Sequence, residues 1–456
     1  MADTRWSAAG TGTAQAALDR RTRNVRNAPV PGRTRVKPDR GTHGHDGDPG
    51  VKQKFDDLAL FGGPAEFSQP LCVGRPTVGD RSRFLERLNG ALDEQWLTNG
   101  GPLMREFEER VAEVAGTRNA VATCNATMGL QLLYMATELT GEVIMSPMTY
   151  VATAHAARIL GLTPVFCDID PATGCLDPRA AEAAVTSRTS AIVPVHLWGR
   201  PSAIDELEKV ADRHGLRLLF DAAHALGCTY QGRPIGGFGG AEVFSFHATK
   251  VVNSFEGGAV VTDDDDLAGR LRSLRSFGFG PDGNSQRTGT NAKMSEAAAA
   301  MGLTSLEAFG ETVLHNRANL AHYASELAGL DGVRVVTYDE DQSPNCQYVV
   351  VKVDENVTGI HRDLLMRVLA EENVVTQRYF SPACHQVEPY RTERPVELPH
   401  TERLADQVLA LPTGPTVTAA DIRRVCAVVR CAVGQGPVVT DRFRQGADRA
   451  PVRATR

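Results

Sequence analysis

Lys250 is the residue whose surroundings most favour covalent chemistry. It lies in the segment FSFHATKVVNSFEGGAVV, between an apolar run and the pair Gly257 and Gly258, where the backbone can pass close to a ligand. A lysine partly removed from water has a lowered pKa, and its neutral amine can attack an aldehyde to form a Schiff base. A lysine after a strand is more often solvated, so this interpretation depends on the residues that accompany it.

Three other residues could support an aromatic cofactor that carries such an aldehyde. Asp221 ends the apolar run LRLLFD, and a carboxylate beside a pyridine nitrogen keeps that nitrogen protonated, which strengthens the ring as an electron sink. The same aspartate could instead cap a helix in the following AAHALG. His224 could hydrogen-bond the ring oxygen or be a satisfied buried histidine. Tyr150 could stack on the ring, although an isolated tyrosine is more often part of a core.

A phosphate group needs several backbone N–H donors and hydroxyl groups, such as those at a helix N-terminus. Asn125, Ala126 and Thr127 open the expected helix MGLQLLYMATEL and offer this arrangement. Helix capping is the alternative role of Thr127. Ser245 could add a hydroxyl group from an adjoining strand. The lysine, the ring contacts and the phosphate site together match the groups that would bind pyridoxal 5′-phosphate (PLP).

Other patterns in the chain point to different chemistry. A GxGxxG occurs at residues 278–283, but the residues before it favour a helix instead of the strand that a dinucleotide site requires. Three histidines and one aspartate could in principle ligate a metal: His196, His224, His247 and Asp221. Their wide spacing leaves proximity unproven, and a nearby Lys250 would suit a metal poorly, so we expect no metal site.

The candidate residues follow short apolar runs that are rich in β-branched residues. Seven such runs are candidate strands: AVATC, EVIMS, PVFCDI, AIVPVHLW, LRLLFD, EVFSFH and GAVVTD. They are too continuously apolar for a sheet with one wet face, and helical segments lie between them. We predict an α/β fold with a mostly parallel seven-stranded sheet flanked by helices. Ligands of such sheets lie beyond the carboxyl ends of the strands, so the candidate residues should share one rim.

The chain divides by composition into four parts. Residues 1–55 are rich in Arg, Thr, Gly, Asp and Pro and predict a disordered extension; a basic arm that binds an acidic partner or nucleic acid is the alternative. We expect a large PLP-binding domain over residues 56–310 and a small C-terminal α+β domain over residues 311–437. Residues 438–456 resemble the first segment in composition and predict a disordered tail.

Composition narrows the classes of partner. The formal net charge of the 456 residues is -6 at pH 7, which gives no reason to expect nucleic acid or an anionic membrane as a partner. No apolar run approaches the roughly 18–20 residues that cross a bilayer, and the N-terminus lacks the apolar core of a signal peptide, so we expect a cytoplasmic protein. The 9 cysteines lack metal-ligand spacing and are expected to be free thiols.

Over roughly residues 58–433 the chain resembles the fold-type I PLP-dependent sugar aminotransferases of the DegT/StrS family. The segments that carry the resemblance are WLTNGGPLMREFEE, CNAT, PMTYVATAHA, PVFCDID, VHLWGRP, DAAHALG, FSFHATK with EGGAVVT, GTNAKMSEAAAAMG, YFSP and LPTG. The resemblance implies a homodimer with shared active sites. Relatives that became dehydratases carry histidine in place of the lysine, so the presence of Lys250 favours amino transfer.

The resemblance also implies a role for individual residues. Lys250 would form the Schiff base, Asp221 would pair with the pyridine nitrogen, and His224 would contact the ring oxygen. The remaining implied contacts are Ala126, Thr127 and Ser245 to the phosphate, Tyr150 to the ring face, and Asn253 to the phosphate in the neighbouring subunit. Many family members carry Gln at the position of His224 and Gly at that of Ala126, so this chain departs from the pattern at these two positions.

Within the family, the combination of FSFHATKVVNSFEGG with GTNAKMSE is most similar to the enzymes of the desosamine-pathway type that aminate C4 of TDP-4-keto-6-deoxy-D-glucose. The implied reaction takes the amino group from L-glutamate and gives TDP-4-amino-4,6-dideoxy-D-glucose, in antibiotic deoxysugar biosynthesis. Asn291 and Lys293 are candidates to bind the two phosphates of this substrate. A surface loop and a helix start are their alternative roles.

Three alternatives stay open at this point. The enzyme could aminate another nucleotide-linked keto sugar, at C3 or with a galacto product. A non-catalytic PLP-binding regulator would keep Lys250, but the N-terminal region lacks a helix-turn-helix pattern. A metal-dependent hydrolase would use the histidines instead of the lysine.

Overall fold

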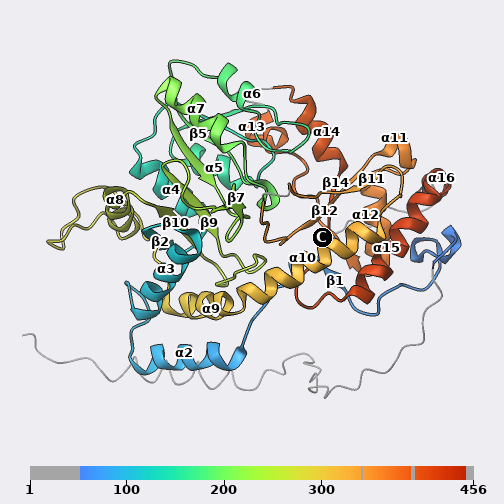
Figure 1. The fold of residues 1–456 in the computed structure, drawn as a ribbon, viewed down its shortest axis with the longest axis horizontal. Helices are drawn as coiled ribbons and strands as arrows, with labels where there is room; N and C mark the ends of the chain where they lie inside the picture. The colour runs from blue at the N-terminus through green and yellow to red at the C-terminus, as the bar shows by residue number, and fades with distance from the viewer. Residues whose placement is uncertain (1–51, 340–341, 392–395, 448–456) are drawn as a thin grey trace, which may run out of the picture. The chain divides into compact units, whose positions relative to one another are not determined.

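The computed structural model describes residues 52–339, 342–391 and 396–447. Its main feature is a seven-stranded sheet with the strand order β2-β10-β9-β6-β5-β3-β4. These strands are β2 (Asn119–Thr123), β3 (Glu142–Met145), β4 (Thr163–Phe166), β5 (Thr189–Val193), β6 (Arg217–Asp221), β9 (Ala241–Ser245) and β10 (Gly258–Thr262). Figure 1 labels the strands β2, β5, β9 and β10 of this sheet. Neighbours pair in parallel except β10, which is antiparallel to both β2 and β9. The predicted mostly parallel seven-stranded sheet is thus confirmed.

Helices cover both faces of this sheet, which explains why its strands are apolar at successive positions. On β5, Ile192 packs into the core on one face and Val193 into the core on the other. The helices of the first face are α3 (Pro102–Ala115), α6 (Pro178–Ala183), α7 (Ile204–His214) and α9 (Glu296–Glu307). Those of the second face are α4 (Ala126–Ala136), α5 (Ala152–Ile159) and α8 (Asp265–Arg275). Helix α2 (Arg81–Asp93) packs on α9.

A smaller α+β domain follows the large sheet, as predicted. Its antiparallel sheet has the order β11-β12-β14, formed by β11 (Val333–Val335), β12 (Val349–Val353) and β14 (Val408–Leu411). The helices of this part of the chain are α10 (Phe309–Glu326), α11 (Glu355–Thr358), α12 (Arg362–Glu371), α13 (Glu388–Arg391), α14 (Pro399–Gln407) and α15 (Ala419–Gly434). Helices α9 and α10 follow each other closely and lead from the large sheet to the small domain (Figure 1).

The first described residues pack with the small domain and not with the large sheet. Strand β1 (Leu71–Cys72) pairs in parallel with β13 (Val374–Val375). Leu58 and Phe67 are buried in the same core as Val351 of the small-domain sheet. The sequence did not indicate this packing, because a two-residue strand leaves no periodic pattern.

The end of the described chain is helical. We expected a disordered tail from residue 438. The structure instead has helix α16 (Gly436–Ala447), which includes the first part of this segment. It is anchored by the fully buried Val439 and by Thr440 Oγ1, which donates a hydrogen bond to the carbonyl of Gly359 at 2.7 Å. Residues 1–51 and 448–456, which fall in the predicted extension and tail, lie outside the described residues.

Asp168, which follows β4, caps a helix of the small domain. Helix α14 has no capping side chain of its own, and the Asp168 carboxylate accepts hydrogen bonds from the backbone N–H groups of His400 and Thr401 at 3.1 and 2.9 Å and from the Thr401 hydroxyl at 2.7 Å. Partial burial raises the pKa of this carboxyl, but these hydrogen bonds outweigh that effect and lower its pKa below 3.8. The carboxylate therefore joins the two parts of the fold.

We expect Asp168→Ala to lower the free energy of unfolding by about 2–3 kcal/mol, because several hydrogen bonds to one charged group are lost. A folded-state pKa below the unfolded value means that this stabilisation is present at neutral pH and is lost as the pH falls through the lowered pKa. Urea unfolding of both proteins between pH 7 and about pH 3 tests this, since the two curves should converge in acid. Asp177→Ala is the matched control, because Asp177 caps only its own helix through Arg179 N and should cost about 1 kcal/mol. Equal losses in the two variants would contradict the role given to Asp168.

Candidate active site

A cavity of about 520 Å³ lies at the carboxyl ends of the central strands. Seven of the residues nominated from the sequence line it: Ala126, Thr127, Tyr150, Asp221, His224, Ser245 and Lys250. They come from the start of α4, from the loop after β3, and from the ends of β6 and β9. The structure thus brings together, at one rim of the sheet, residues that are as much as 124 positions apart in the sequence, from Ala126 to Lys250.

Lys250 extends into this cavity from a turn that follows β9. The turn is closed by a hydrogen bond from Lys250 N to the carbonyl of His247 at 2.8 Å. The amine Nζ donates a hydrogen bond to the hydroxyl of Tyr348 at 3.2 Å. Burial lowers the pKa of Lys250 to about 8, against smaller opposing effects of Asp221 and Tyr150. A large fraction of the amine is therefore neutral, and nucleophilic, in mildly alkaline solution.

Asp221 is the last residue of β6, and its carboxylate is held by two donors. Oδ1 accepts from the backbone N–H of Ala223 at 3.0 Å, and Oδ2 accepts from the hydroxyl of Thr153 at 2.7 Å. The Thr153 hydroxyl is in turn 2.6 Å from that of Thr149. The residues after Asp221 form turns, so the helix that it might have capped is absent from this described segment. The carboxylate is left as an oriented anion at the cavity wall.

His224 is buried, and a hydrogen bond to its ring determines which ring nitrogen carries the proton. Nδ1 accepts from the backbone N–H of Trp198 at 3.3 Å, so the ring proton of the neutral form is on Nε2. Burial, with a smaller effect of the Lys250 charge, lowers the pKa of His224 well below its usual value. The ring packs edge-on against Tyr348 and is stacked with Phe380, with centroid distances of 5.1 and 5.8 Å. His224 can therefore act as a neutral N–H donor in a fixed orientation.

The start of α4 offers the anion-binding end of the cavity. The Asn125 side chain caps the helix by accepting from Met128 N at 2.9 Å. The backbone N–H groups of Ala126 and Thr127 open the helix and have no intrahelical acceptor. A Cβ at Gly258 would lie 2.6 Å from the backbone nitrogen of Ala126, so a glycine is needed where β10 passes this turn. These amides, with the nearby hydroxyl groups, fit a phosphate.

Tyr150 resolves one of the alternatives left by the sequence. Its side chain is 63% exposed, so it is not a core aromatic residue, and it lines the cavity beside Phe380 at a centroid distance of 6.3 Å. An amine, an oriented carboxylate, a neutral N–H donor, an aromatic face and a phosphate-binding helix end therefore surround one cavity. This set of residues fits PLP.

Three nominated residues do not reach the cavity of their own chain. Asn253 is buried, and its amide donates to the carbonyl of Thr77 and accepts from the backbone N–H of Phe255. Lys293 lines a separate cavity of about 130 Å³, where its amine lies 4.8 Å from the ring centroid of Phe277. Asn291 is exposed. None of these three positions is among the residues that line the cavity.

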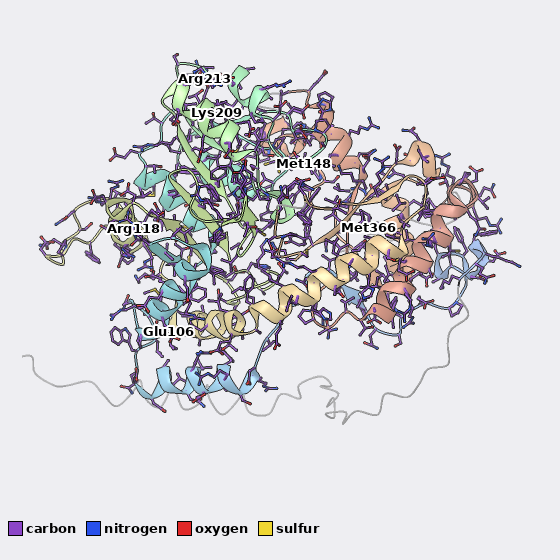
Figure 2. The ribbon with its side chains drawn as sticks, viewed as in Figure 1. Glu106, Arg118, Met148, Lys209, Arg213 and Met366 are labelled. Atoms are coloured by element: carbon purple, nitrogen blue, oxygen red, sulfur yellow. The ribbon has the colours of Figure 1, made fainter. Side chains whose placement is uncertain are left out.

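The small domain supplies cavity residues that sequence reasoning did not assign. Tyr348 and Phe380 line the cavity, as does Tyr379, for which the sequence suggested no specific role. Met148, which is labelled in Figure 2, is fully buried. It packs with Tyr348 and Phe380 in one hydrophobic core, which includes residues of both the large domain and the small domain. The sequence signal for Tyr348 was only its place before an apolar strand, which does not indicate where its hydroxyl points.

His196, one of the three histidines considered as metal ligands, has other partners. Nδ1 of His196 accepts from Ser202 N at 3.0 Å, Nε2 lies 3.2 Å from Glu242, and the ring is stacked on Phe220. Within the described ranges, no group of three or more metal-ligating side chains is assembled. The same ranges contain no helix long and apolar enough to span a bilayer.

Comparison with known proteins agrees with this geometry. The model of the DegT/DnrJ/EryC1/StrS aminotransferase family matches residues 79–430. The crystal structure of DesI in the presence of its TDP-sugar product is 64% identical, covers 85% of this chain and 99% of DesI, and has a TM-score of 0.83. S. venezuelae DesV, in complex with a ketimine intermediate, is 33% identical, with 79% and 98% of the two chains covered and a TM-score of 0.73. Helicobacter pylori PseC, an aminotransferase involved in the biosynthesis of pseudoaminic acid, is 25% identical, with 80% and 99% covered and a TM-score of 0.74.

The family match spans most of the chain, and the cavity holds the groups that PLP requires. The resemblance noted from the sequence is therefore confirmed. The chain belongs to the DegT/DnrJ/EryC1/StrS aminotransferase family and is a PLP-dependent sugar aminotransferase.

Proposed function

We propose that this enzyme transfers the amino group of L-glutamate to C4 of TDP-4-keto-6-deoxy-D-glucose and forms TDP-4-amino-4,6-dideoxy-D-glucose, as a step in the biosynthesis of an antibiotic deoxysugar. The observation that carries the proposal is the 64% identity, over nearly the whole of DesI, with a protein whose structure was determined with its TDP-sugar product. A cytoplasmic location is part of the proposal. The nine cysteines, all within the described ranges, are free thiols, as expected in a reducing compartment.

Lys250 is the proposed base and acid of both half-reactions. When bound, PLP supplies an electron sink that stabilises negative charge at the carbon that loses a proton. The amine of Lys250 removes the α-proton of L-glutamate in the first half-reaction and delivers a proton to C4 of the sugar in the second. Its lowered pKa, about 8, keeps the amine available as a base.

The other cavity residues hold the cofactor in the proposed arrangement. Asp221 directs its carboxylate at the pyridine nitrogen, and the hydrogen bonds from Ala223 and Thr153 hold the carboxylate in this orientation. His224 presents its Nε2–H to the ring oxygen. The backbone amides at the start of α4, with the hydroxyl groups of Thr127 and Ser245, bind the phosphate. Tyr150 lies against the ring.

The substrate's two phosphates need cations that the cavity of one chain lacks. Among the described residues that line it, Lys250, His224 and His247 are the only basic side chains, and two of them serve the cofactor. We therefore include a homodimer with shared sites in the proposal, with Asn291 and Lys293 of one subunit reaching the diphosphate in the other. Asn253 is less suited to such a role because its amide is used within its own subunit.

Exposed aromatic residues near these positions support an interface there. Phe277, which contacts Lys293, is 45% exposed, and Phe255, which follows Asn253 closely, is 48% exposed. Phe277 also packs against Phe279, which is 46% exposed, at a centroid distance of 6.1 Å, and neighbouring exposed aromatic side chains can mark an interaction surface. A second copy of the chain would bury them and complete the site at the same time.

Mixing two inactive variants tests the shared site. If Lys293 acts in the partner's site, a mixture of Lys250→Ala and Lys293→Ala that has exchanged subunits contains hybrid dimers with one intact site, and should regain about one quarter of the wild-type activity. Each variant alone should remain far less active. A mixture without any gain, after exchange has been confirmed by mass spectrometry, would contradict the role of Lys293 across the dimer.

The identity of the product tests the proposed reaction. The enzyme is incubated with PLP, ¹⁵N-labelled L-glutamate and TDP-4-keto-6-deoxy-D-glucose, and the product is examined by NMR. We expect the label on C4, with a large H3–H4 coupling that reports the gluco configuration. A label on C3 or a small coupling would favour another sugar product. Failure of every amino donor to give its 2-oxo acid would favour the non-catalytic regulator.

A further inference from the structure

Tyr348 makes the hydrogen bond that the structure records for the reacting amine. Its hydroxyl lies 3.2 Å from Lys250 Nζ, and the centroid of its ring is 5.6 Å from the same atom. The tyrosine is only 4% exposed, so this contact is shielded from solvent. It comes from the small domain, 98 residues from the lysine. A side chain held this close to the proton-transferring atom can affect the reaction directly.

The segment that carries Tyr348 is fixed to both sides of the cavity. Gln347 donates through Nε2 to the carbonyl of His224 at 2.8 Å and accepts through Oε1 from the backbone N–H of Val251 at 3.3 Å. Asn345 also donates to the carbonyl of His224, at 2.9 Å. Gln347, the residue next to Tyr348, therefore connects the turn that carries His224 to the turn that carries Lys250.

Aromatic packing fixes the ring itself. Tyr348 meets the rings of His224 and Tyr379 edge-on, each at a centroid distance of 5.1 Å. Both contacts use the ring and leave the hydroxyl free to face Lys250. Replacement by phenylalanine would therefore remove one oxygen atom and leave this packing in place.

The chemistry of a buried phenol suits both states of the amine. Burial raises the pKa of Tyr348, so it stays neutral. A neutral hydroxyl accepts a hydrogen bond from an ammonium group and can donate one to a neutral amine. Two other groups affect the pKa of Lys250: Asp221 and Tyr150 both raise it. The positive charge of Lys250 in turn lowers the pKa of His224.

We propose that Tyr348 is a catalytic residue of the amino-transfer reaction: its hydroxyl binds the free amine of Lys250 whenever the lysine is not joined to the cofactor, and holds it in position for proton transfer. When the amine takes the α-proton of the amino donor, it becomes an ammonium group whose hydrogen bond Tyr348 accepts. The ammonium group passes this proton to the cofactor and becomes neutral. In the second half-reaction the amine takes a proton back from the cofactor and gives it to C4 of the sugar, so it is again neutral against the same hydroxyl. The inference rests on the proposed role of Lys250 but not on the identity of the sugar.

Tyr348→Phe and the control Tyr379→Phe test this role with two readouts. The first is the pKa of Lys250 in the PLP-free enzyme, from the pH dependence of its reaction with trinitrobenzenesulfonate, corrected with Lys250→Ala. Loss of the acceptor for the ammonium group should lower this pKa by roughly one unit in Tyr348→Phe and leave it unchanged in Tyr379→Phe. The second is the single-turnover rate with L-glutamate, which should fall about 10- to 100-fold with an unchanged dissociation constant for glutamate.

The outcomes separate this proposal from the proposed function. An unchanged pKa and an unchanged single-turnover rate in Tyr348→Phe would overturn it. A slower reaction with weaker glutamate binding and an unchanged pKa would also overturn it, because Tyr348 would then be a substrate contact. If wild type itself does not react with glutamate, the proposed donor is wrong, and the pKa measurement on the PLP-free enzyme still decides the role of Tyr348. Thermal unfolding of each variant confirms that the ring packing is kept.

Discussion

Lys250→Ala is expected to lower the rate of amino transfer by at least about 10³-fold, because one substitution removes both the nucleophile that binds the cofactor and the base that moves the proton. The other cavity contacts remain, so the variant should still bind PLP, although more weakly. Stopped-flow absorbance with L-glutamate measures the rate of the first half-reaction directly. We expect no other single substitution in the cavity to lower this rate as much.

Two controls distinguish loss of the amine from damage to the site. Lys250→Arg keeps a positive charge and a long side chain, but its guanidinium stays protonated and cannot act as a base, so it should be as inactive as the alanine variant. Methylamine added to Lys250→Ala supplies a small free amine in the vacated space and should restore part of the rate. An alanine variant that keeps a tenth of the wild-type rate would show that another group carries the proton.

Asp221→Asn is expected to lower the same rate by roughly 10²- to 10³-fold, because it removes a fixed charge from the place where the pyridine nitrogen is stabilised. The amide oxygen can still accept the hydrogen bond from Ala223, which the carboxylate receives at 3.0 Å, so the fold of the turn should be kept. Single-turnover kinetics with L-glutamate and PLP titration provide the rate and the affinity. The loss should be in the rate more than in the affinity for glutamate.

A modified cofactor tests whether charge is the cause. Asp221→Ala loaded with PLP that is methylated at the pyridine nitrogen carries a permanent positive charge on the ring, so it should recover part of the lost rate. The same analogue should slow the wild-type enzyme, because a methylated nitrogen can no longer donate a hydrogen bond to the Asp221 carboxylate. Equal rates for Asp221→Asn and wild type would mean that Asp221 has only a structural role.

The large sheet could be predicted because its sequence pattern follows from burial on both faces. On β5, Ile192 and Val193 are apolar for the same reason, although they enter different cores. The residues at the strand ends were also predictable, since parallel strands bring Asp221 and Lys250 to one rim. The residues alone suggested PLP but left alternatives for each of them, and the family resemblance added a single role for each residue.

The parts that were not predicted depend on contacts between distant segments. The hydroxyl of Tyr348 meets Lys250 across 98 residues, and no local pattern reports such a contact. Strand β1 pairs with β13 through only two residues on each side, which is too short for a periodic signal. Helix α16 was hidden by its charged composition, and Val439 and Thr440 anchor it. Each of these features is decided by packing and not by local propensity.

The absorbance spectrum of the wild-type enzyme with PLP, before and after L-glutamate and then TDP-4-keto-6-deoxy-D-glucose, tests the central claim most directly. We predict a visible band of lysine-bound PLP, which is absent in Lys250→Ala, is bleached by glutamate and returns when the sugar is added. A wild-type enzyme that shows no such band with PLP, or whose band does not respond to any amino donor, would contradict the account of this protein as an aminotransferase that works through Lys250.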